Sequence, residues 1–371
     1  MWRIALVSDS LAVLGEQVLA GAALAPRQRP AHLRLFESWG QDVVAALERW
    51  RPDGILAYAG RQLLADLCGL GLPLVAVVEN PDRLAPCAIT VDEHAVGALA
   101  ASTLLDRGLS QFAFLAQGHG GTEREAGWCQ ALSAAGRTSS AFRLMGSHDD
   151  GERLRAWLSG LLRPCGLFAY NDLVGIEAIE VCHDLGLEVP GDISIIGADD
   201  LIARCTATEP QLSSVQVPHA AIGRESMVAL QDLLLDRRRR ALTCLPPAGV
   251  ALRASSDSSA IGDEVVAAGM AAISADPLHI LTVDDLARRL GVSRRTLERR
   301  FRDALGRGPL AELHRARITR AKGLLLEGWN LPAIADATGF GSLSAFQRCF
   351  KRLVGLSPSG FTHRYARDRL L

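Results

Sequence analysis

One spacing of alanine, glycine, phenylalanine and proline occurs twice near the C-terminus of this 371-residue chain. Each copy has an alanine, a glycine four residues later, a short turn, an apolar residue, a phenylalanine four residues on, a glycine five further and a proline three further. The first copy contains Ala287, Gly291, Leu297, Phe301, Gly306 and Pro309. The second contains Ala335, Gly339, Phe346, Phe350, Gly355 and Pro358, with one extra residue in its turn. The chain therefore holds two copies of one supersecondary unit.

Each copy carries one apolar stripe that runs over two helices and a turn. A glycine between the helices lets the backbone reverse, so each copy predicts a helix-turn-helix in an all-α domain. The inward residues of the first are Leu286, Leu290, Val292, Leu297 and Phe301. Those of the second are Ile334, Phe340, Phe346, Phe350 and Leu353.

The segment between the two modules keeps helical spacing from Pro309 to Gly328. Proline is tolerated in the first turn of a helix, and glycine is common directly after the last. One continuous helix is therefore predicted to join the modules.

The charge of the chain is divided unevenly. Residues 264–371 hold 18 Lys and Arg against 10 Asp and Glu, a net charge of +8, and the rest hold 22 against 31, a net charge of −9. With 38 Arg and only two Lys in the chain, arginine could serve solubility alone, but that does not explain the asymmetry. The C-terminal part is therefore expected to bind a polyanion.

The second helix of each module presents side chains that can contact DNA. Arginine can donate two hydrogen bonds to guanine, glutamine can pair with adenine, and glutamate can accept from cytosine. Residues near the helix start should read bases, whereas Arg302 and Lys351 should hold phosphates; a solvated surface position is the alternative for each. Leu343 could pack under Phe346 or against a thymine methyl group. The outward positions are Arg294, Arg295, Glu298, Arg299, Arg302, Ser344, Ala345, Gln347, Arg348 and Lys351.

The paired modules resemble the DNA-binding domain of the AraC/XylS family of transcription regulators. The resemblance covers roughly the last hundred residues and includes the pairs Gly339 with Phe340 and Phe350 with Lys351, and the closing Gly355 and Pro358. It implies that the joining helix sets both second helices into successive major grooves of double-stranded DNA, about 34 Å apart.

The preceding two-thirds of the chain alternates short apolar runs with helical stretches. Runs that are apolar throughout predict strands of a parallel sheet covered by helices on both faces. At roughly 250 residues this is one large α/β domain or two α/β lobes. The predicted strands lie in 3–9, 53–59, 74–79, 111–117, 166–172 and 192–200, and the clearest helices lie in 15–25 and 93–108.

Two segments resemble the effector-binding core of the LacI/GalR repressors, which has the two-lobed fold of periplasmic binding proteins. The first segment carries Arg124, Gly127 and Trp128. The second carries Asn171, Asp172, Gly186, Val189, Pro190, Gly197, Asp199 and Asp200. The resemblance implies a sensor domain over residues 1–254. Small polar residues then predict a linker at 255–263, followed by the DNA-binding domain at 264–371.

Polar residues follow several predicted strands, where ligands of open parallel sheets bind. Carboxylates, an amide and a guanidinium suit a polyhydroxylated ligand, because a hydroxyl is both donor and acceptor. The resemblance makes Arg124, Asn171 and Asp199 the strongest candidates. Asp172 has a competing role as a helix cap, and Asp9 and Asp92 depend on their strand-end position more than on a motif.

The LacI/GalR headpiece has no counterpart before the first predicted strand. A binding-protein core joined to a C-terminal AraC-type domain resembles the arrangement of xylose-operon activators. That arrangement implies a cytoplasmic homodimer that binds direct-repeat half-sites, responds to a small sugar, with D-xylose as the leading candidate, and recruits RNA polymerase. A repressor, or a regulator with a non-pentose ligand, is the alternative.

Other classes of protein find little support. No signal peptide or membrane-spanning run is evident, and the glycines from Gly118 lack the spacing of a phosphate-binding loop. Ser147 to Asp150 fits a turn better than a metal cluster. Eight cysteines without a C-x-x-C pair indicate reduced thiols. We therefore expect no catalytic residues, no metal and no cofactor.

Overall fold

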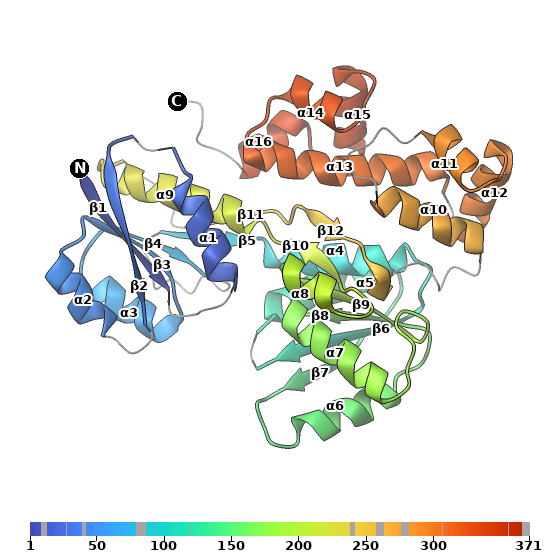
Figure 1. Cartoon of the computed structure of the whole chain (residues 1–371), viewed down its shortest axis with the longest axis horizontal. Coiled ribbons are helices and arrows are strands. Elements are labelled where there is room, and N and C mark those ends of the chain that lie inside the picture. Colours follow the sequence, from blue (N-terminus) through green and yellow to red (C-terminus); the bar gives the residue numbers. More distant parts are fainter. Residues whose placement is uncertain are drawn as a thin grey trace. The chain divides into compact units, whose positions relative to one another are not determined.

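A computed structural model describes residues 1–8, 13–26, 28–38, 42–78, 87–118, 120–237, 242–256, 263–275, 282–305, 307–354 and 356–365. The chain divides into two compact units (Figure 1). Unit 1 consists of Met1–Asp92 and Pro218–Pro246, and unit 2 of Glu93–Val217 and Pro247–Leu371. The chain therefore passes between the units three times.

Unit 1 is a parallel sheet with helices on both faces, in the strand order β11-β5-β4-β3-β1-β2. One face is covered by α2 and α3, and the other by α1 and α9. The strands are β1 (Trp2–Ser8), β2 (Ala31–Glu37), β3 (Gly54–Tyr58), β4 (Leu74–Val77), β5 (Ala88–Val91) and β11 (Leu242–Leu245). The helices are α1 (Val13–Ala23), α2 (Val43–Trp50), α3 (Arg61–Gly69) and α9 (His219–Leu233).

Unit 2 contains a second sheet, in the order β12-β10-β9-β8-β6-β7, whose pairs are parallel except β10 with β12. Its strands are β6 (Gln111–Gln117), β7 (Ser140–Leu144), β8 (Cys165–Ala169), β9 (Ile193–Ala198), β10 (Ser213–Gln216) and β12 (Gly249–Ala251). The helices around it are α4 (Glu93–Leu105), α5 (Thr122–Ala134), α6 (Asp150–Ser159), α7 (Asp172–Asp184) and α8 (Ile202–Ala207).

The two parallel α/β sheets confirm the predicted fold class of the sensor. Every predicted apolar strand is present. These strands are buried on both faces, and this is why their sequences are apolar throughout. The strands β2, β5, β7, β10, β11 and β12 are not among the predicted ones. The side chains of the edge strands β2 and β7 are partly exposed, so neither is apolar throughout.

Glycines bring helices into backbone contact in both units. A Cβ atom on Gly97 of α4 would lie 1.8 Å from the Arg124 carbonyl oxygen, and one on Gly127 of α5 would lie 1.9 Å from that of His94. In unit 1, α1 and α9 touch in the same way through Gly21. These helix pairs are therefore as close as two backbones allow.

The linker prediction is wrong at its first two positions. Ser255 and Ser256 are 0% exposed and belong to the sensor lobe, where a 3-10 turn spans Ala254–Ser256. The Ser255 hydroxyl donates to the Ile195 carbonyl at 2.7 Å and accepts from the Ser213 amide at 2.9 Å. Small polar residues can thus be buried when the edge of a sheet supplies their partners. Residues 257–262 lie outside the described ranges.

The DNA-binding domain consists of α10 to α16 in the described part of the chain. The first module, with α10, encloses one core around Leu297 and Phe301, and the second, with α16, encloses another around Phe346 and Phe350. Leu353 is a correction, because it is 39% exposed rather than inward. The helices are α10 (Glu264–Ala275), α11 (Val283–Arg289), α12 (Arg294–Leu305), α13 (Pro309–Glu327), α14 (Leu331–Ala337), α15 (Leu343–Val354) and α16 (Pro358–Tyr365).

The glycine contact between α4 and α5 can be tested by Gly127→Ala. The added methyl group would overlap the His94 carbonyl, so we expect the free energy of unfolding to fall by about 1–3 kcal/mol. Gly151→Ala in α6 is the control, because no atom lies within 4 Å of that site, and stability there should be unchanged or rise by up to about 1 kcal/mol. Urea unfolding measures both. Equal effects of the two substitutions would contradict the contact.

Candidate effector site and DNA interface

The candidate effector site lies where three neighbouring strands of unit 2 end. Because β9, β8 and β6 are adjacent and parallel, their carboxyl ends meet at one edge of the sheet. Asp199 follows β9 directly, Tyr170 and Asn171 follow β8, and Arg124 lies in the first turn of α5 after β6. The sheet thus brings together three of the predicted ligand residues.

Arg124 is the centre of this cluster and is only 5% exposed. Its guanidinium forms an ion pair with Glu93, the first residue of α4, and a second with Asp199, each with an N–O distance of 3.3 Å at Nη2. It also donates to the carbonyl oxygen of Tyr170. A buried cation needs such compensation, so two carboxylates and a carbonyl fix its position.

The backbone at the end of β9 is held in an unusual conformation. Asp199 has a φ of 107° and Asp200 a φ of 55°, values that residues other than glycine rarely adopt. The Asp199 amide donates to the Val215 carbonyl at 2.9 Å, and the Asp200 amide donates to the Ser214 hydroxyl at 2.9 Å. Such strain concentrates at functional sites, where the surroundings impose it.

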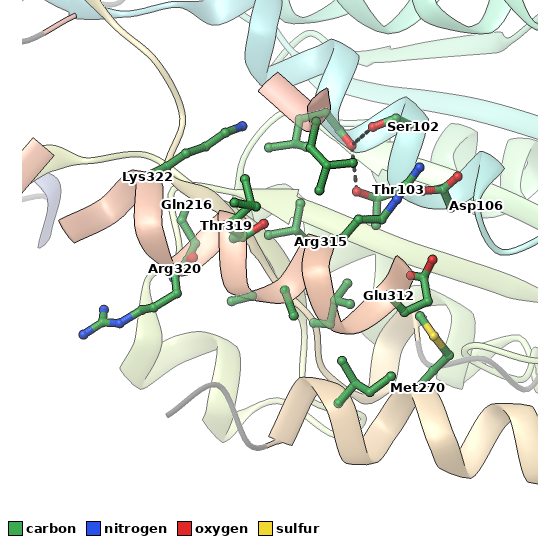
Figure 2. Close-up of a pocket in the computed structure, with 18 of the residues that line it drawn as sticks. Ser102, Thr103, Asp106, Gln216, Met270, Glu312, Arg315, Thr319, Arg320 and Lys322 are labelled. Carbon is green, nitrogen blue, oxygen red and sulfur yellow. Dashed lines mark hydrogen bonds and ion pairs between the residues drawn. The ribbon is translucent and has the colours of Figure 1, made fainter. Parts of the chain in front are cut away.

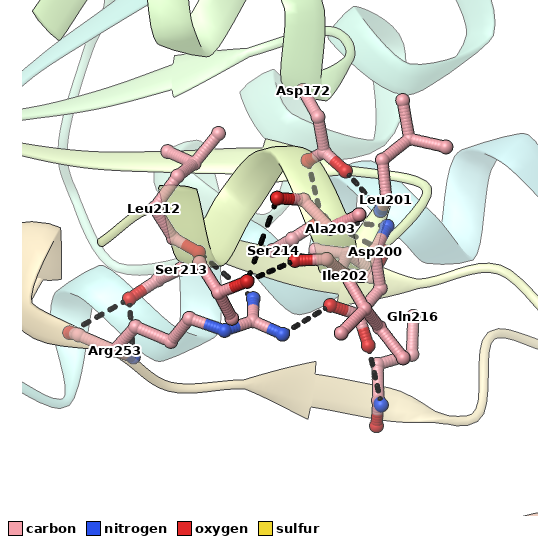
Figure 3. A network of polar contacts seen from close by, with 12 residues as sticks. Asp172, Asp200, Leu201, Ile202, Ala203, Leu212, Ser213, Ser214, Gln216 and Arg253 are labelled. Atoms are coloured by element: carbon pink, nitrogen blue, oxygen red, sulfur yellow. Dashed lines mark hydrogen bonds and ion pairs between the residues drawn. The ribbon is translucent and has the colours of Figure 1, made fainter. Parts of the chain in front are cut away.

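A polar network around Asp200, the residue after Asp199, supports that backbone (Figure 3). One oxygen of Asp200 accepts from Arg253 at 2.6 Å, and the other accepts from Gln216 at 2.9 Å. Arg253 also donates to the carbonyl of Leu212 at 2.8 Å. Asp200 therefore anchors the turn that positions Asp199.

Asn171 and Asp172 have local partners. Asn171 caps α7, because its side chain accepts from the Val174 amide at 3.0 Å, so the alternative role of Asp172 as the helix cap is wrong. Asp172 is 0% exposed; it accepts from the Leu201 amide at 2.7 Å and from the Ser214 hydroxyl. Their ligand contacts stay predictions, and for Asp172 the contact would require its enclosed carboxylate to be uncovered.

The glycine-rich loop before α5 packs against the Tyr170 ring. A Cβ atom on Gly120 would lie 2.9 Å from the ring, and one on Gly121 would lie 2.8 Å from the Tyr170 Cβ. These glycines therefore seat an aromatic side chain rather than a phosphate.

Two predicted ligand residues belong to unit 1. Asp92 follows β5 and is half-buried, with its amide donating to the Leu245 carbonyl at 2.6 Å. Asp9 lies outside the described residues. The contacts of both with a ligand stay predictions.

The candidate DNA interface begins at the first module. Thr282 and Asp285 form a reciprocal capping box at the start of α11. On α12, Arg294 pairs with Asp284 at 2.8 Å and with Glu298 at 2.9 Å, and these carboxylates raise the pKa of Arg294. Arg294 and Glu298 would have to exchange these partners to contact bases.

Most other cations of the two recognition helices are exposed, whereas Arg300 is half-buried and pairs with Asp263 at 3.2 Å. Arg295, Arg299, Arg302, Arg348 and Lys351 form no ion pair with another residue that the structure describes, and Ser344 is exposed beside them. Gln347 is half-buried. Leu343 and Ala345 pack against the second core, which favours the packing role of Leu343 and corrects the outward placement of Ala345.

The joining helix α13 begins at Pro309 and ends before Gly328, as the sequence predicts. Gly328 adopts a φ of 85°, which suits the end of a helix. With 19 residues, α13 is about 28 Å long. It packs against helices of both modules, so it joins them rigidly.

Two protein families match consecutive parts of the chain. Residues 101–256 match the periplasmic binding protein-like domain, and residues 286–364 match a helix-turn-helix domain. The chain is 42% identical over 102 residues to a putative AraC-like transcription regulator of Streptomyces antibioticus, covering 27% of this chain and 34% of that protein. The chain is a transcription regulator with an AraC-type DNA-binding domain and a periplasmic-binding-protein-like domain.

Longer relatives share the whole arrangement. The regulator is 26% identical over 333 residues to the xylose operon regulatory protein of Escherichia coli K12, covering 85% of each chain. Its fold is similar to the solved structure of a xylose-binding transcription activator, XylR, with a TM-score of 0.61, 24% identity and 97% of each chain covered. No helix within the described ranges is long and apolar enough to cross a membrane.

Sequence reasoning missed three parts of the regulator. Glu93 and Tyr170 belong to no motif, and each adjoins a residue that the sequence does predict as a ligand contact, Asp92 and Asn171 respectively. The helix α10, which contributes Val266 and Met270 to the first core, has few polar residues and no motif. An apolar helical run directly before the first module was the available signal.

Replacing Asp172 by asparagine should alter how stability depends on pH. Burial raises the pKa of Asp172 to about 6, although hydrogen bonds from Ser214 and Leu201 lower it. The folded protein therefore binds this proton more tightly than the unfolded chain does. The protonated Asp172 side chain stabilises the fold at low pH by up to about 3 kcal/mol, and this contribution is lost as pH rises from about 4 to about 6.

Urea unfolding from pH 4 to 7 measures this effect. The difference in unfolding free energy between wild type and Asp172→Asn should change across that window. Asp184→Asn, at the other end of α7, is the control, because its carboxylate is exposed. A pH-independent difference for Asp172→Asn would contradict the assignment.

Proposed function

We propose that this regulator is an activator whose sensor domain binds a neutral polyhydroxylated ligand at the cluster of Arg124, Glu93 and Asp199. The observation that supports this proposal is a buried guanidinium that pairs with two carboxylates at the carboxyl ends of the unit 2 strands. The three groups together carry one net negative charge, which disfavours an anionic ligand. Carboxylate oxygens with remaining lone pairs and guanidinium donors suit hydroxyl groups.

D-xylose is the proposed ligand. The xylose operon regulatory protein and the xylose-binding activator both cover most of the regulator's length. A pentose is small and uncharged, in agreement with the charge of the cluster. A ligand controls the regulator only by preferring one conformation, and a shift from 1:99 to 99:1 needs about 5.5 kcal/mol of differential affinity.

We further propose that α12 and α15 enter successive major grooves on one face of duplex DNA. Their exposed cations and the length of α13 support this arrangement, because successive grooves on one face lie about 34 Å apart. Two protomers would present four modules to direct-repeat half-sites in a promoter. The homodimer would act in the cytoplasm and recruit RNA polymerase.

Titration calorimetry with D-xylose tests the effector site. Arg124→Ala removes the donor group of the cluster and should lower affinity by roughly ten- to a hundredfold, the value of a charge-assisted hydrogen bond. Arg155→Ala, which breaks an exposed ion pair with Asp184, is the control and should bind normally. Unchanged affinity of folded Arg124→Ala would remove Arg124 from the site, and a thermal-shift panel of pentoses and hexoses would reveal a different sugar.

Arg299→Ala and Arg348→Ala test the recognition helices, because the two arginines occupy equivalent positions two residues before Phe301 and Phe350. Each should cost about 1–3 kcal/mol and relax base preference at a different half-site. Arg302→Ala and Lys351→Ala should instead weaken binding to all sequences and lower the salt dependence by about one ion. Binding to a randomised duplex library at several salt concentrations measures both effects. Uniform weakening by Arg299→Ala would make Arg299 a phosphate contact.

A further inference from the structure

A cavity of about 760 Å³ lies within unit 2 where the sensor lobe meets the DNA-binding domain (Figure 2). Its walls come from α4 and β12 on the sensor side and from α10, α13 and α15 on the other. A Cβ atom on Gly249 would lie 1.8 Å from the Thr319 methyl carbon, so β12 and α13 are in close contact beside the cavity.

One carboxylate at the rim of this cavity holds two arginines of the DNA-binding domain. Asp106, directly after the last turn of α4, pairs with Arg307 at 3.1 Å and also pairs with Arg315 of α13. Arg307 in turn pairs with Glu312, so the contact is a four-residue network. Burial raises the pKa of Asp106, and the two guanidiniums oppose that shift.

The neighbouring residue fastens the same end of α4 to the sensor. Arg107 donates to the Thr103 carbonyl at 3.2 Å and to the carbonyl of Ser256. Ser256 is the last described residue before the segment that leads to α10. The C-terminal end of α4 is thus bound both to α13 and to the exit of the sensor lobe.

The other end of α4 belongs to the candidate effector site. Glu93, its first residue, forms an ion pair with Arg124. Glu93 and Asp106 are 13 residues apart, about 20 Å along a helix. Between them Gly97 packs against the backbone of α5, and close-packed helices move as units rather than deform.

We propose that α4 couples the Arg124 cluster to the DNA-binding domain, with Glu93 responding to the occupancy of the cluster and Asp106 holding α13. A hydroxylated ligand that competes for Glu93 or Asp199 shifts the N-terminal end of α4. The helix carries that shift to the ion pairs with Arg307 and Arg315. The claim that a ligand starts this signal rests on the proposed function. The coupling of Glu93 to Asp106 through α4 does not.

Hydrogen exchange of the α13 amides in the full-length, ligand-free protein tests the link. Asp106→Asn and Arg315→Gln each remove an ion pair to α13, so each should raise exchange there by roughly five- to tenfold. Arg315→Gln leaves the sensor sequence intact. Asp184→Asn, which breaks an exposed ion pair within the sensor, is the matched control and should leave α13 exchange unchanged.

A double-mutant cycle separates coupling from simple attachment. Glu93→Gln should raise α13 exchange although it lies at the far end of α4, and this effect should vanish in the Asp106→Asn background. If Glu93→Gln leaves α13 exchange unchanged, or acts equally in both backgrounds, the proposal is overturned. Thermal unfolding of each variant identifies any that is globally destabilised. Arg124→Gln removes the partner of Glu93 and is therefore a second probe of the N-terminal end of α4, with the same expected effect on α13 exchange.

Addition of D-xylose completes the test. Saturating D-xylose should change α13 exchange in the wild type and have no effect in Asp106→Asn. A ligand-dependent change that persists in Asp106→Asn would overturn the role of Asp106. The ligand-free cycle decides the proposal by itself, so a failure of D-xylose to bind in calorimetry would count against the sugar assignment alone.

Discussion

The sensor lobe depends on the interactions of one buried group, the guanidinium of Arg124. Its charge could not be buried without compensation, and the compensation comes from Glu93 on α4, Asp199 after β9 and the carbonyl of Tyr170 after β8. One side chain thereby ties a helix and two strand ends. A ligand that competed for these carboxylates would weaken interactions that also hold the lobe together, and its binding would thereby favour a different conformation.

Local sequence patterns predict much of the fold. The duplicated spacing around Phe301 and Phe350, the helix from Pro309 and the strands buried on both faces were predictable, because periodicity and turn residues determine them. The partners of Arg124 were not predictable from the sequence. Glu93 belongs to no motif, and only the folded position of α4 brings it beside Arg124. Buried hydroxyls such as Ser255 look like linker residues, because a sequence does not show which polar group will meet a sheet edge.

The division of charge along the chain has two uses. The exposed cations of α12 and α15 suit a polyanion, but Arg307 and Arg315 face a carboxylate of the sensor. Part of the positive charge of the DNA-binding domain is therefore engaged within the regulator.

The repeated passage of the chain between its units bears on how the protein is made. The edge strand β11 and the helix α9 complete unit 1, yet both follow nearly all of the second sheet in sequence. During synthesis the first five strands of unit 1 must therefore wait, with α9 and its apolar face absent, until about residue 246 has left the ribosome. Unit 1 therefore cannot be complete until most of the second sheet has been synthesised, so premature termination within the sensor would yield an incomplete, aggregation-prone lobe.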